Sequence, residues 1–201
     1  MSKLPKSFFL NENVLEVSEQ LLGKVLCTKI DGILTSGMIV ETEAYNGISD
    51  KASHAFGNRR TKRTEIMFGE GGFSYVYLCY GIYSLFNVVT NLKEIPHAVL
   101  IRAIEPIDGI EKMLERRGKS KLETNLTSGP GILSQALGIN FREHNGLDLQ
   151  KDEIWIESRG VEISKNEILR SSRVGVDYAE EDAKLPWRFR IQNNKWTSKA
   201  K

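Results

Sequence analysis

Two strand-like runs joined by Asp31 and Gly32 constrain the fold more than any other feature of the sequence. KVLCTKI (24–30) and ILTSGMIVETEAY (33–45) are rich in β-branched and apolar side chains. Asp-Gly between two such runs is a strong signal for a β-hairpin, because both residues tolerate the positive φ that a two-residue turn needs. The two strands are therefore predicted to pair antiparallel.

Strands also follow strands in the rest of the chain. The run 71–91 predicts two strands around a turn or bulge at Gly81. Further strands are predicted within 98–106, 152–160 and 187–194, and helices within 10–23, 108–120 and 127–139. Because strands rarely alternate with helices, we predict an α+β fold in one domain spanning 1–201. Its sheet is expected to be curved, mainly antiparallel and open-barrel-like, with helices around it.

Composition excludes several classes of protein. The two cysteines, Cys27 and Cys79, lie in apolar segments, which favours free thiols in a reducing compartment. The sequence has no secretory signal and no apolar run long enough to span a membrane, so we expect a cytoplasmic protein, nucleoid-associated if bacterial. The three histidines have no metal-ligand spacing, and no glycine-rich phosphate loop or nucleophile elbow is present. We therefore expect no metal and no cofactor.

Two glutamates, Glu41 and Glu43, lie two positions apart in the second strand of the hairpin. In an extended chain they share a face with Ile39 and Tyr45, and their Cα atoms lie roughly 6.5–7 Å apart. Paired carboxylates can stabilise a sugar cation and activate water at a glycosidic bond. An exposed strand face with basic neighbours would give the same spacing, so the spacing alone leaves both interpretations open.

Basic and aromatic residues cluster after this strand. NRRTKR (58–63) ends a long polar loop that begins at Asn46, and four tyrosines lie within 75–83. These patterns suit phosphate contacts and stacking on an extruded base, but also a solvated loop and ordinary core packing. After Asp182 the chain is basic without acidic residues, which fits either phosphate contacts or a disordered tail. The basic residues of this tail are Lys184, Arg188, Arg190, Lys195, Lys199 and Lys201.

Several segments together resemble the alkyladenine (3-methyladenine) DNA glycosylases of the mammalian alkylpurine type. The resemblance rests on LLGKVL, VETEAYNG, DKASHAFGNRRTKRTEIMF, YVYLCYGIYSLFNVV, VLIRAIEP, SGPGILSQALGI and RVGVDYAEEDAKLPWRFRI, in the order of that family. It implies a monofunctional base-excision repair enzyme that flips damaged purines out of double-stranded DNA. It also implies hydrolysis of the N-glycosidic bond without a metal, by a protein that we expect to be a monomer.

The resemblance also implies roles for particular residues. Glu43 corresponds to the general base that activates water, and Arg102 to an arginine at the sugar-phosphate end of the site. The expected base-binding residues are Tyr45 and Tyr77 as stacking rings, His54 at the pocket edge, backbone groups of Ala52 and His54, and Asn87 against the exocyclic amine of guanine. The expected DNA contacts are Tyr80, as the intercalating residue, and Arg59 and Thr61 near the DNA backbone.

This chain departs from the mammalian pattern in three respects. Arg60 replaces an uncharged polar residue, Ile82 replaces a methionine, and the long N-terminal extension is missing. These differences concern DNA affinity and the range of lesions, not the catalytic residues. Two alternatives are a non-catalytic module that binds damaged or single-stranded nucleic acid and a hydrolase of free nucleosides. A buried Glu43 near phosphates argues against the first, and the basic loop argues against the second.

Overall fold

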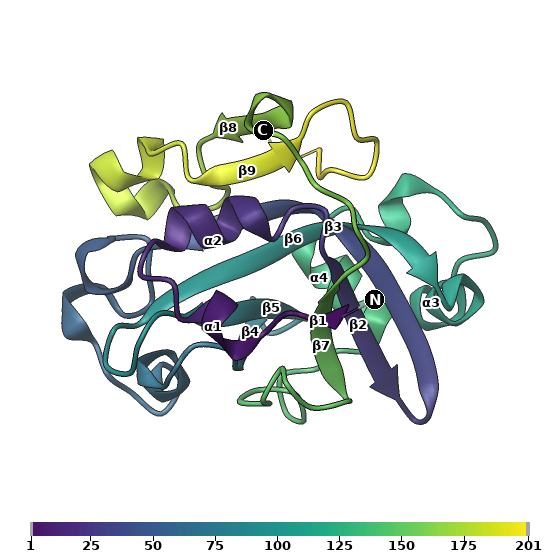
Figure 1. Ribbon diagram of the computed structural model, residues 1–201, viewed down its shortest axis with the longest axis horizontal. Helices are drawn as coiled ribbons and strands as arrows, with labels where there is room; N and C mark the ends of the chain where they lie inside the picture. The colour runs from purple at the N-terminus through teal and green to yellow at the C-terminus, as the bar shows by residue number, and fades with distance from the viewer. Residues whose placement is uncertain (1, 200–201) are drawn as a thin grey trace.

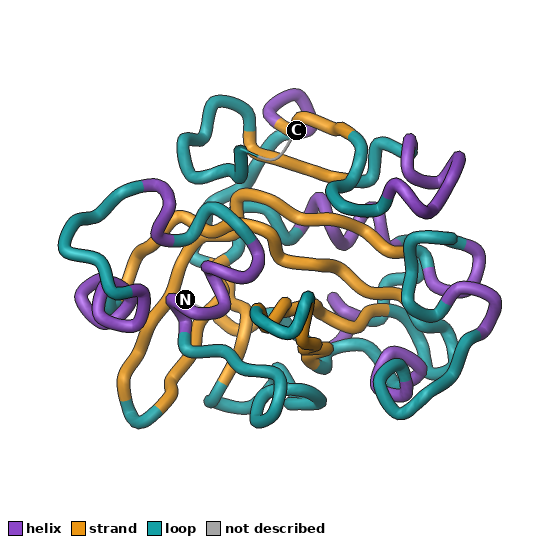
Figure 2. Tube along the Cα trace, turned by 180° about the vertical axis from the view of Figure 1, so that it is seen from behind, coloured by secondary structure: helices purple, strands orange, loops and turns teal. Residues whose placement is uncertain are grey.

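A curved, mainly antiparallel sheet forms the middle of the molecule, which confirms the predicted α+β class (Figure 1). The structure is a computed structural model that describes residues 2–199, and within them the sheet has nine strands in the order β1-β7-β2-β3-β6-β5-β4, with β9 pairing β3 and β8 pairing β9. The strands are β1 (Ser2–Lys3), β2 (Val25–Ile30), β3 (Ile33–Tyr45), β4 (Ser74–Cys79), β5 (Tyr83–Thr90), β6 (His97–Asp108), β7 (Ile154–Ser158), β8 (Ile168–Ser171) and β9 (Arg188–Ile191). Figure 2 shows the loops gathered at the ends of these strands.

Strand β3 is the point where the sheet divides. One edge of β3 pairs with β6 along most of its length, while the other edge pairs first with β2 and then, at Glu41–Glu43, with β9. The backbone of β3 is therefore paired on both edges at these residues, and the side chains of Glu41 and Glu43 are completely buried. The expectation of an exposed face for these glutamates is therefore wrong.

The register between β3 and β6 has two irregularities beside these glutamates. Pairing passes from Ile39 to Glu41 without Val40 on β3, and skips Arg102 on β6. Ile39 and Val40 both lie in the main hydrophobic core. The predicted alternation of side chains between the two faces of the strand therefore begins only at Glu41. Bulges of this kind redirect side chains next to functional sites, and here the redirected residue is Arg102.

Both predicted hairpins close through two consecutive residues with positive φ. Asp31 and Gly32 have φ of 54° and 76° between β2 and β3, and Tyr80 and Gly81 have φ of 51° and 71° between β4 and β5. In the first hairpin, where Ile30 pairs with Ile33, this two-residue turn matches the twist of the flanking strands. The second hairpin has a third loop residue, because Cys79 pairs with Tyr83. Only the second turn places a large aromatic side chain at a position where glycine or asparagine is the usual residue.

The helices cover the two faces of the sheet. They are α1 (Lys6–Phe9), α2 (Val14–Gln20), α3 (Ile110–Arg117) and α4 (Pro130–Leu137). Figure 1 shows α2 in front of β3 and β6 and α4 behind them. The side chain of Asn13 caps α2 by accepting from the backbone of Leu15 and Glu16. Gly118 and Gly138 end α3 and α4 in the left-handed conformation, as their sequence positions predicted.

The basic C-terminal segment is ordered, so the alternative of a disordered tail is wrong for residues 184–199. Strand β9 lies in this segment, and Trp196 and Ser198 are buried. Arg188 is 2% exposed and pairs with Glu41, so it is not available for phosphate contacts. Lys201 lies outside the described residues. The 46–63 loop contains only the short 3-10 turns η1 (Gly47–Ser49) and η2 (Phe56–Asn58).

Candidate active site

A cavity of about 540 Å³ opens at one end of the sheet, within the size range of small-molecule sites. Its lining comes from the end of β3, the 46–63 loop, the β4–β5 hairpin, β6, the start of α4 and the segment 174–178. Tyr45, Ala52, His54, Tyr77, Tyr80, Asn87 and Arg102 all line it. The structure therefore brings together most of the residues that the resemblance indicated.

Glu43 lies directly behind the cavity wall. Its Oε2 accepts a hydrogen bond from the Tyr45 hydroxyl at 2.9 Å, and its Oε1 accepts one from the Val174 backbone N–H at 2.8 Å. Arg102 Nη1 lies 3.3 Å from Oε1. All three partners line the cavity, and they supply the donors and positive charge that a buried carboxylate requires. Among the described residues only Tyr45 donates to Oε2, which leaves this oxygen able to accept a hydrogen bond from a water molecule.

The Tyr45 hydroxyl is a permanent donor in this arrangement. Burial of the ring, and next the negative charge of Glu43, raise the pKa of Tyr45 well above its ordinary value. Tyr45 thus stays protonated and keeps its hydrogen on the side of Glu43.

Glu41 holds Arg102 and does not line the cavity. Its Oε1 accepts from Arg102 Nε at 3.0 Å, from Arg188 Nε at 2.7 Å and from the Ser198 hydroxyl at 2.8 Å. Its Oε2 accepts from the Ser198 backbone N–H. The two glutamates are therefore not a symmetric catalytic pair. Glu41 pairs with basic neighbours, as one interpretation of the sequence expected, but it does so in the interior.

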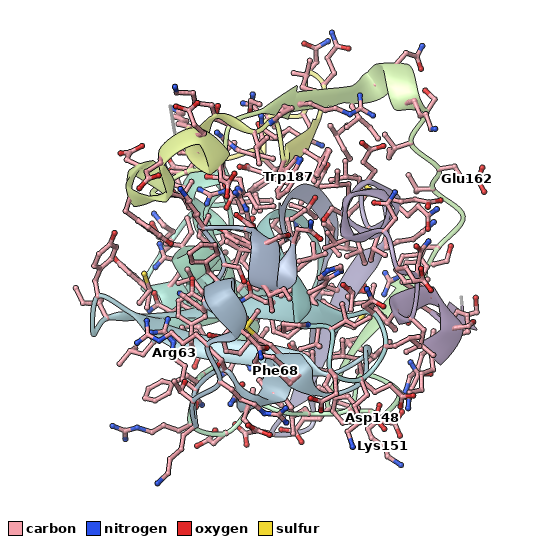
Figure 3. All side chains as sticks on the ribbon, turned by 90° about the vertical axis from the view of Figure 1, so that its left-hand side faces the viewer. Arg63, Phe68, Asp148, Lys151, Glu162 and Trp187 are labelled. Atoms are coloured by element: carbon pink, nitrogen blue, oxygen red, sulfur yellow. The ribbon has the colours of Figure 1, made fainter. Side chains whose placement is uncertain are left out.

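Each of the two predicted stacking rings lies against an arginine. The Arg173 guanidinium is 4.9 Å from the centre of the Tyr45 ring and 5.0 Å from that of Trp187, while the Arg63 guanidinium is 4.7 Å from the Tyr77 ring. Neither arginine lines the cavity. Figure 3 views this end of the molecule, with Trp187 above and Arg63 below. The cations hold both rings by cation–π attraction and leave the cavity itself to the aromatic faces.

His54 is held as a neutral ring. Arg63 Nη2 lies 3.0 Å from His54 Nε2 and 3.4 Å from His54 Nδ1. His54 Nδ1 also forms a 2.8 Å hydrogen bond with the Tyr75 hydroxyl. Burial, and next the charges of Arg63 and Arg59, lower the pKa of His54 to about 4. At neutral pH His54 is therefore no proton donor of the imidazolium type.

Asn87 lines the cavity with a fixed amide. Its Nδ2 donates to the Tyr75 carbonyl at 3.0 Å, across the β4–β5 pair. Tyr75 itself is 2% exposed and packs in a small hydrophobic cluster, and it also lines the cavity.

Tyr80, unlike Tyr75, has a side chain that is exposed to solvent. It is 86% exposed at the tip of the β4–β5 hairpin, next to Ile82, which is 70% exposed. Core packing is therefore wrong for Tyr80. An aromatic ring presented on a tight turn at the cavity mouth has the shape of a wedge.

The basic residues of the loop 58–63 differ in whether they form ion pairs. Arg60 pairs with Glu65 and Glu94 and lies over the Phe68 ring. Within residues 2–199, the exposed side chains of Arg59 and Lys62 have no ion-pair partner. Arg59 and Thr61 lie on the loop outside the cavity lining.

Sequence reasoning missed several groups in this site. The Val174 amide contacts Glu43, and the preceding residue, Arg173, forms a two-armed ion pair with Asp50 at 2.5 and 2.8 Å. Asp50 also accepts from the backbone N–H groups of Ala52 at 2.9 Å and Asn46 at 3.1 Å. Because 123 residues separate Asp50 from Arg173, no local pattern could pair them. The start of α4 was missed as well.

A family model described as methylpurine-DNA glycosylase matches residues 8–195. The chain belongs to this family. It is therefore a DNA glycosylase of base-excision repair, an enzyme that hydrolyses N-glycosyl bonds, and the alternative of a non-catalytic module is wrong. The resemblance noted in the sequence is confirmed.

Bacterial relatives of this glycosylase match along almost their whole length. A Bacillus cytotoxicus protein is 48% identical over 98% of this chain and 100% of its own. Proteins of Chlamydia felis (47%, over 96% of this chain and 97% of the relative) and Clostridium acetobutylicum (48%, over 98% and 97%) are similar. Each carries a provisional name as a 3-methyladenine DNA glycosylase.

None of the helices within residues 2–199 of this glycosylase combines the length and apolar character of a membrane span. These residues also contain no group of three or more His, Cys, Asp or Glu residues placed to hold a metal ion.

Proposed function

We propose that residues 1–201 form one glycosylase domain that flips alkylated or deaminated purines out of double-stranded DNA and releases them with a water activated by Glu43. The expected lesions are of the 3-methyladenine, 7-methylguanine and hypoxanthine type. The observation that carries the proposal is the buried Glu43 carboxylate behind an aromatic cavity, with Arg102 and Tyr45 on its oxygens.

In the proposed reaction, the bond between the purine and C1′ of the sugar breaks and a bond from water oxygen to C1′ forms. Glu43 accepts the proton of the water, while its negative charge stabilises the cationic sugar. A purine alkylated at N3 or N7 is already cationic and leaves as a neutral molecule, so one carboxylate suffices. A neutral lesion such as hypoxanthine also needs a proton as it leaves, and the neutral His54 ring does not supply it.

The flipped base would stack between Tyr45 and Tyr77, with Asn87 set against the exocyclic amine of guanine. Backbone groups of Ala52 and His54 would bind the base edge. This is supported by the His54 backbone N–H, for which the described residues supply no acceptor. Arg102 would act at the sugar-phosphate end, and Arg59 and Thr61 would contact the DNA backbone.

Excision from methylated duplex DNA tests the proposal. We expect free 3-methyladenine to be released, while the corresponding free nucleoside is left intact, because the basic loop serves only a polymeric substrate. Borohydride should trap no covalent adduct, since water is the nucleophile. Cleavage of the nucleoside alone would instead favour the nucleoside hydrolase, and a trapped adduct would exclude the proposed mechanism.

Light scattering tests the expected monomer, and localisation in intact cells tests the expected cytoplasmic, nucleoid-associated site.

Tyr80 is the proposed wedge that fills the place of the flipped base. Its replacement, Tyr80→Ala, should lower single-turnover excision from duplex DNA by roughly 5- to 100-fold, the value of one lost stacking contact. The same lesion in single-stranded DNA should be affected much less, because no stack has to be filled. Leu169→Ala, at an exposed position on β8, serves as the control. Equal losses on duplex and single-stranded DNA would contradict the wedge.

A further inference from the structure

Tyr178 lies at the cavity mouth and has no role in the mechanism above. Its side chain is 65% exposed, yet it lines the cavity. It stands on the 3-10 segment η6 (Asp177–Lys184), and its hydroxyl donates a 3.1 Å hydrogen bond to the backbone carbonyl of Ala52, which lines the cavity too. This contact joins two segments that are 126 residues apart.

The two partners of this hydrogen bond differ in conformational freedom. The Ala52 carbonyl is fixed, because the Ala52 N–H is bound to Asp50 and Asp50 is paired with the buried Arg173. A carbonyl oxygen has two lone pairs, so one remains for a ligand. The Tyr178 hydroxyl can rotate about its C–O bond and direct its hydrogen elsewhere. The wall thus offers a fixed acceptor beside an adjustable donor.

Purine lesions differ in what they present at position 6. An adenine-type base carries an amino group, which donates hydrogen bonds, and a guanine- or hypoxanthine-type base carries an oxygen, which accepts them. A fixed carbonyl alone would accept from the amino group and repel the oxygen. The adjacent hydroxyl can donate to the oxygen and so remove that repulsion.

We propose that the Tyr178 hydroxyl is a specificity-determining group that allows the cavity to take 6-oxo purines next to a carbonyl suited to 6-amino purines. The inference rests on the proposed function and names one determinant of its substrate range. It assigns direct contact with the lesion to a residue of η6, outside the stacking rings.

Tyr178→Phe tests this inference with a single pool of methylated duplex DNA. That DNA contains 3-methyladenine, a 6-amino base, and 7-methylguanine, a 6-oxo base, and both are cationic, so lesion charge is matched. The variant should lower the rate of 7-methylguanine release relative to 3-methyladenine by about two- to ten-fold, the effect of one neutral hydrogen bond. The rate of hypoxanthine release from a duplex with a single hypoxanthine should fall by the same factor relative to the rate of 3-methyladenine release.

Tyr83→Phe is the matched control, since it removes the hydroxyl of another exposed tyrosine of the cavity that makes no hydrogen bond within residues 2–199. We expect it to keep the wild-type ratio of the two bases. An unchanged ratio in Tyr178→Phe, or a shift toward the 6-oxo bases, would overturn the inference while leaving the proposed function intact. Wild-type protein that releases neither base would overturn both. A thermal melt confirms that each variant is folded.

Discussion

Glu43→Gln is expected to bind damaged duplex DNA and to excise the lesion 10²- to 10⁴-fold more slowly than the wild-type enzyme, the range for loss of a general base. Glutamine keeps the size of the side chain and an oxygen that can accept from the Val174 N–H, but it carries no negative charge and cannot take a proton from water. The stacking rings and Arg102 are unchanged, so affinity should survive. Single-turnover excision and gel-shift titration measure the two quantities separately.

The control for this variant is Glu157→Gln. Glu157 is also a strand glutamate that is largely buried, at 8% exposure, with Arg159 Nε at 2.7 Å, but it lies on β7 and does not line the cavity. The same chemical change there should leave excision per folded molecule near the wild-type rate. If Glu43→Gln excises within ten-fold of wild type, the assignment of Glu43 as the base is wrong.

The sequence was sufficient for elements whose signals are local. Asp31-Gly32 and the break at Gly81 predicted two hairpins because turn chemistry depends on adjacent residues. Gly118 and Gly138 marked helix ends for the same reason. Strand β8 lacked a comparable signal, since its four residues form a strand only by pairing with β9.

The family resemblance named many of the residues that line the cavity, but it named neither Val174 nor the start of α4, and it did not give the electrostatics of the site. The family resemblance indicated Glu43, Tyr45 and Arg102, but period-two spacing could not distinguish the roles of Glu41 and Glu43. That distinction depends on which distant groups reach each carboxylate. Ser198 donates to Glu41 across 157 residues, and Val174 donates to Glu43 across 131. Both donors belong to the C-terminal part of the chain, whose strand β9 pairs with β3 at Glu41–Glu43.

Three buried carboxylates around the cavity are each matched by a buried guanidinium. Glu41 pairs with Arg188 and Arg102, Glu43 with Arg102, and Asp50 with Arg173. Charges in such a place are tolerated only when they are paired and hydrogen-bonded. The Asp50–Arg173 pair has the widest structural reach, because it connects the 46–63 loop, the Tyr45 ring and the segment that carries Val174.

Asp50→Asn should therefore be the most destabilising of the conservative changes near the cavity. The side chains of Asp50 and Arg173 are both 0% exposed, and removing one charge leaves the other buried without compensation, which costs about 3–5 kcal/mol. Asparagine also places an amide N–H₂ where Asp50 now accepts hydrogen bonds from Arg173 and Ala52. Urea unfolding followed by circular dichroism measures the free energy of unfolding.

Asp152→Asn provides the comparison, because Asp152 forms its ion pair with Lys3 at the surface, where its side chain is 92% exposed. Water and salt screen such a pair, so the free energy of unfolding should change little. Equal effects of the two substitutions would show that the Asp50–Arg173 pair does not carry the stability assigned to it. A large loss confined to Asp50→Asn would show that the stability of the fold depends on a contact between segments 123 residues apart.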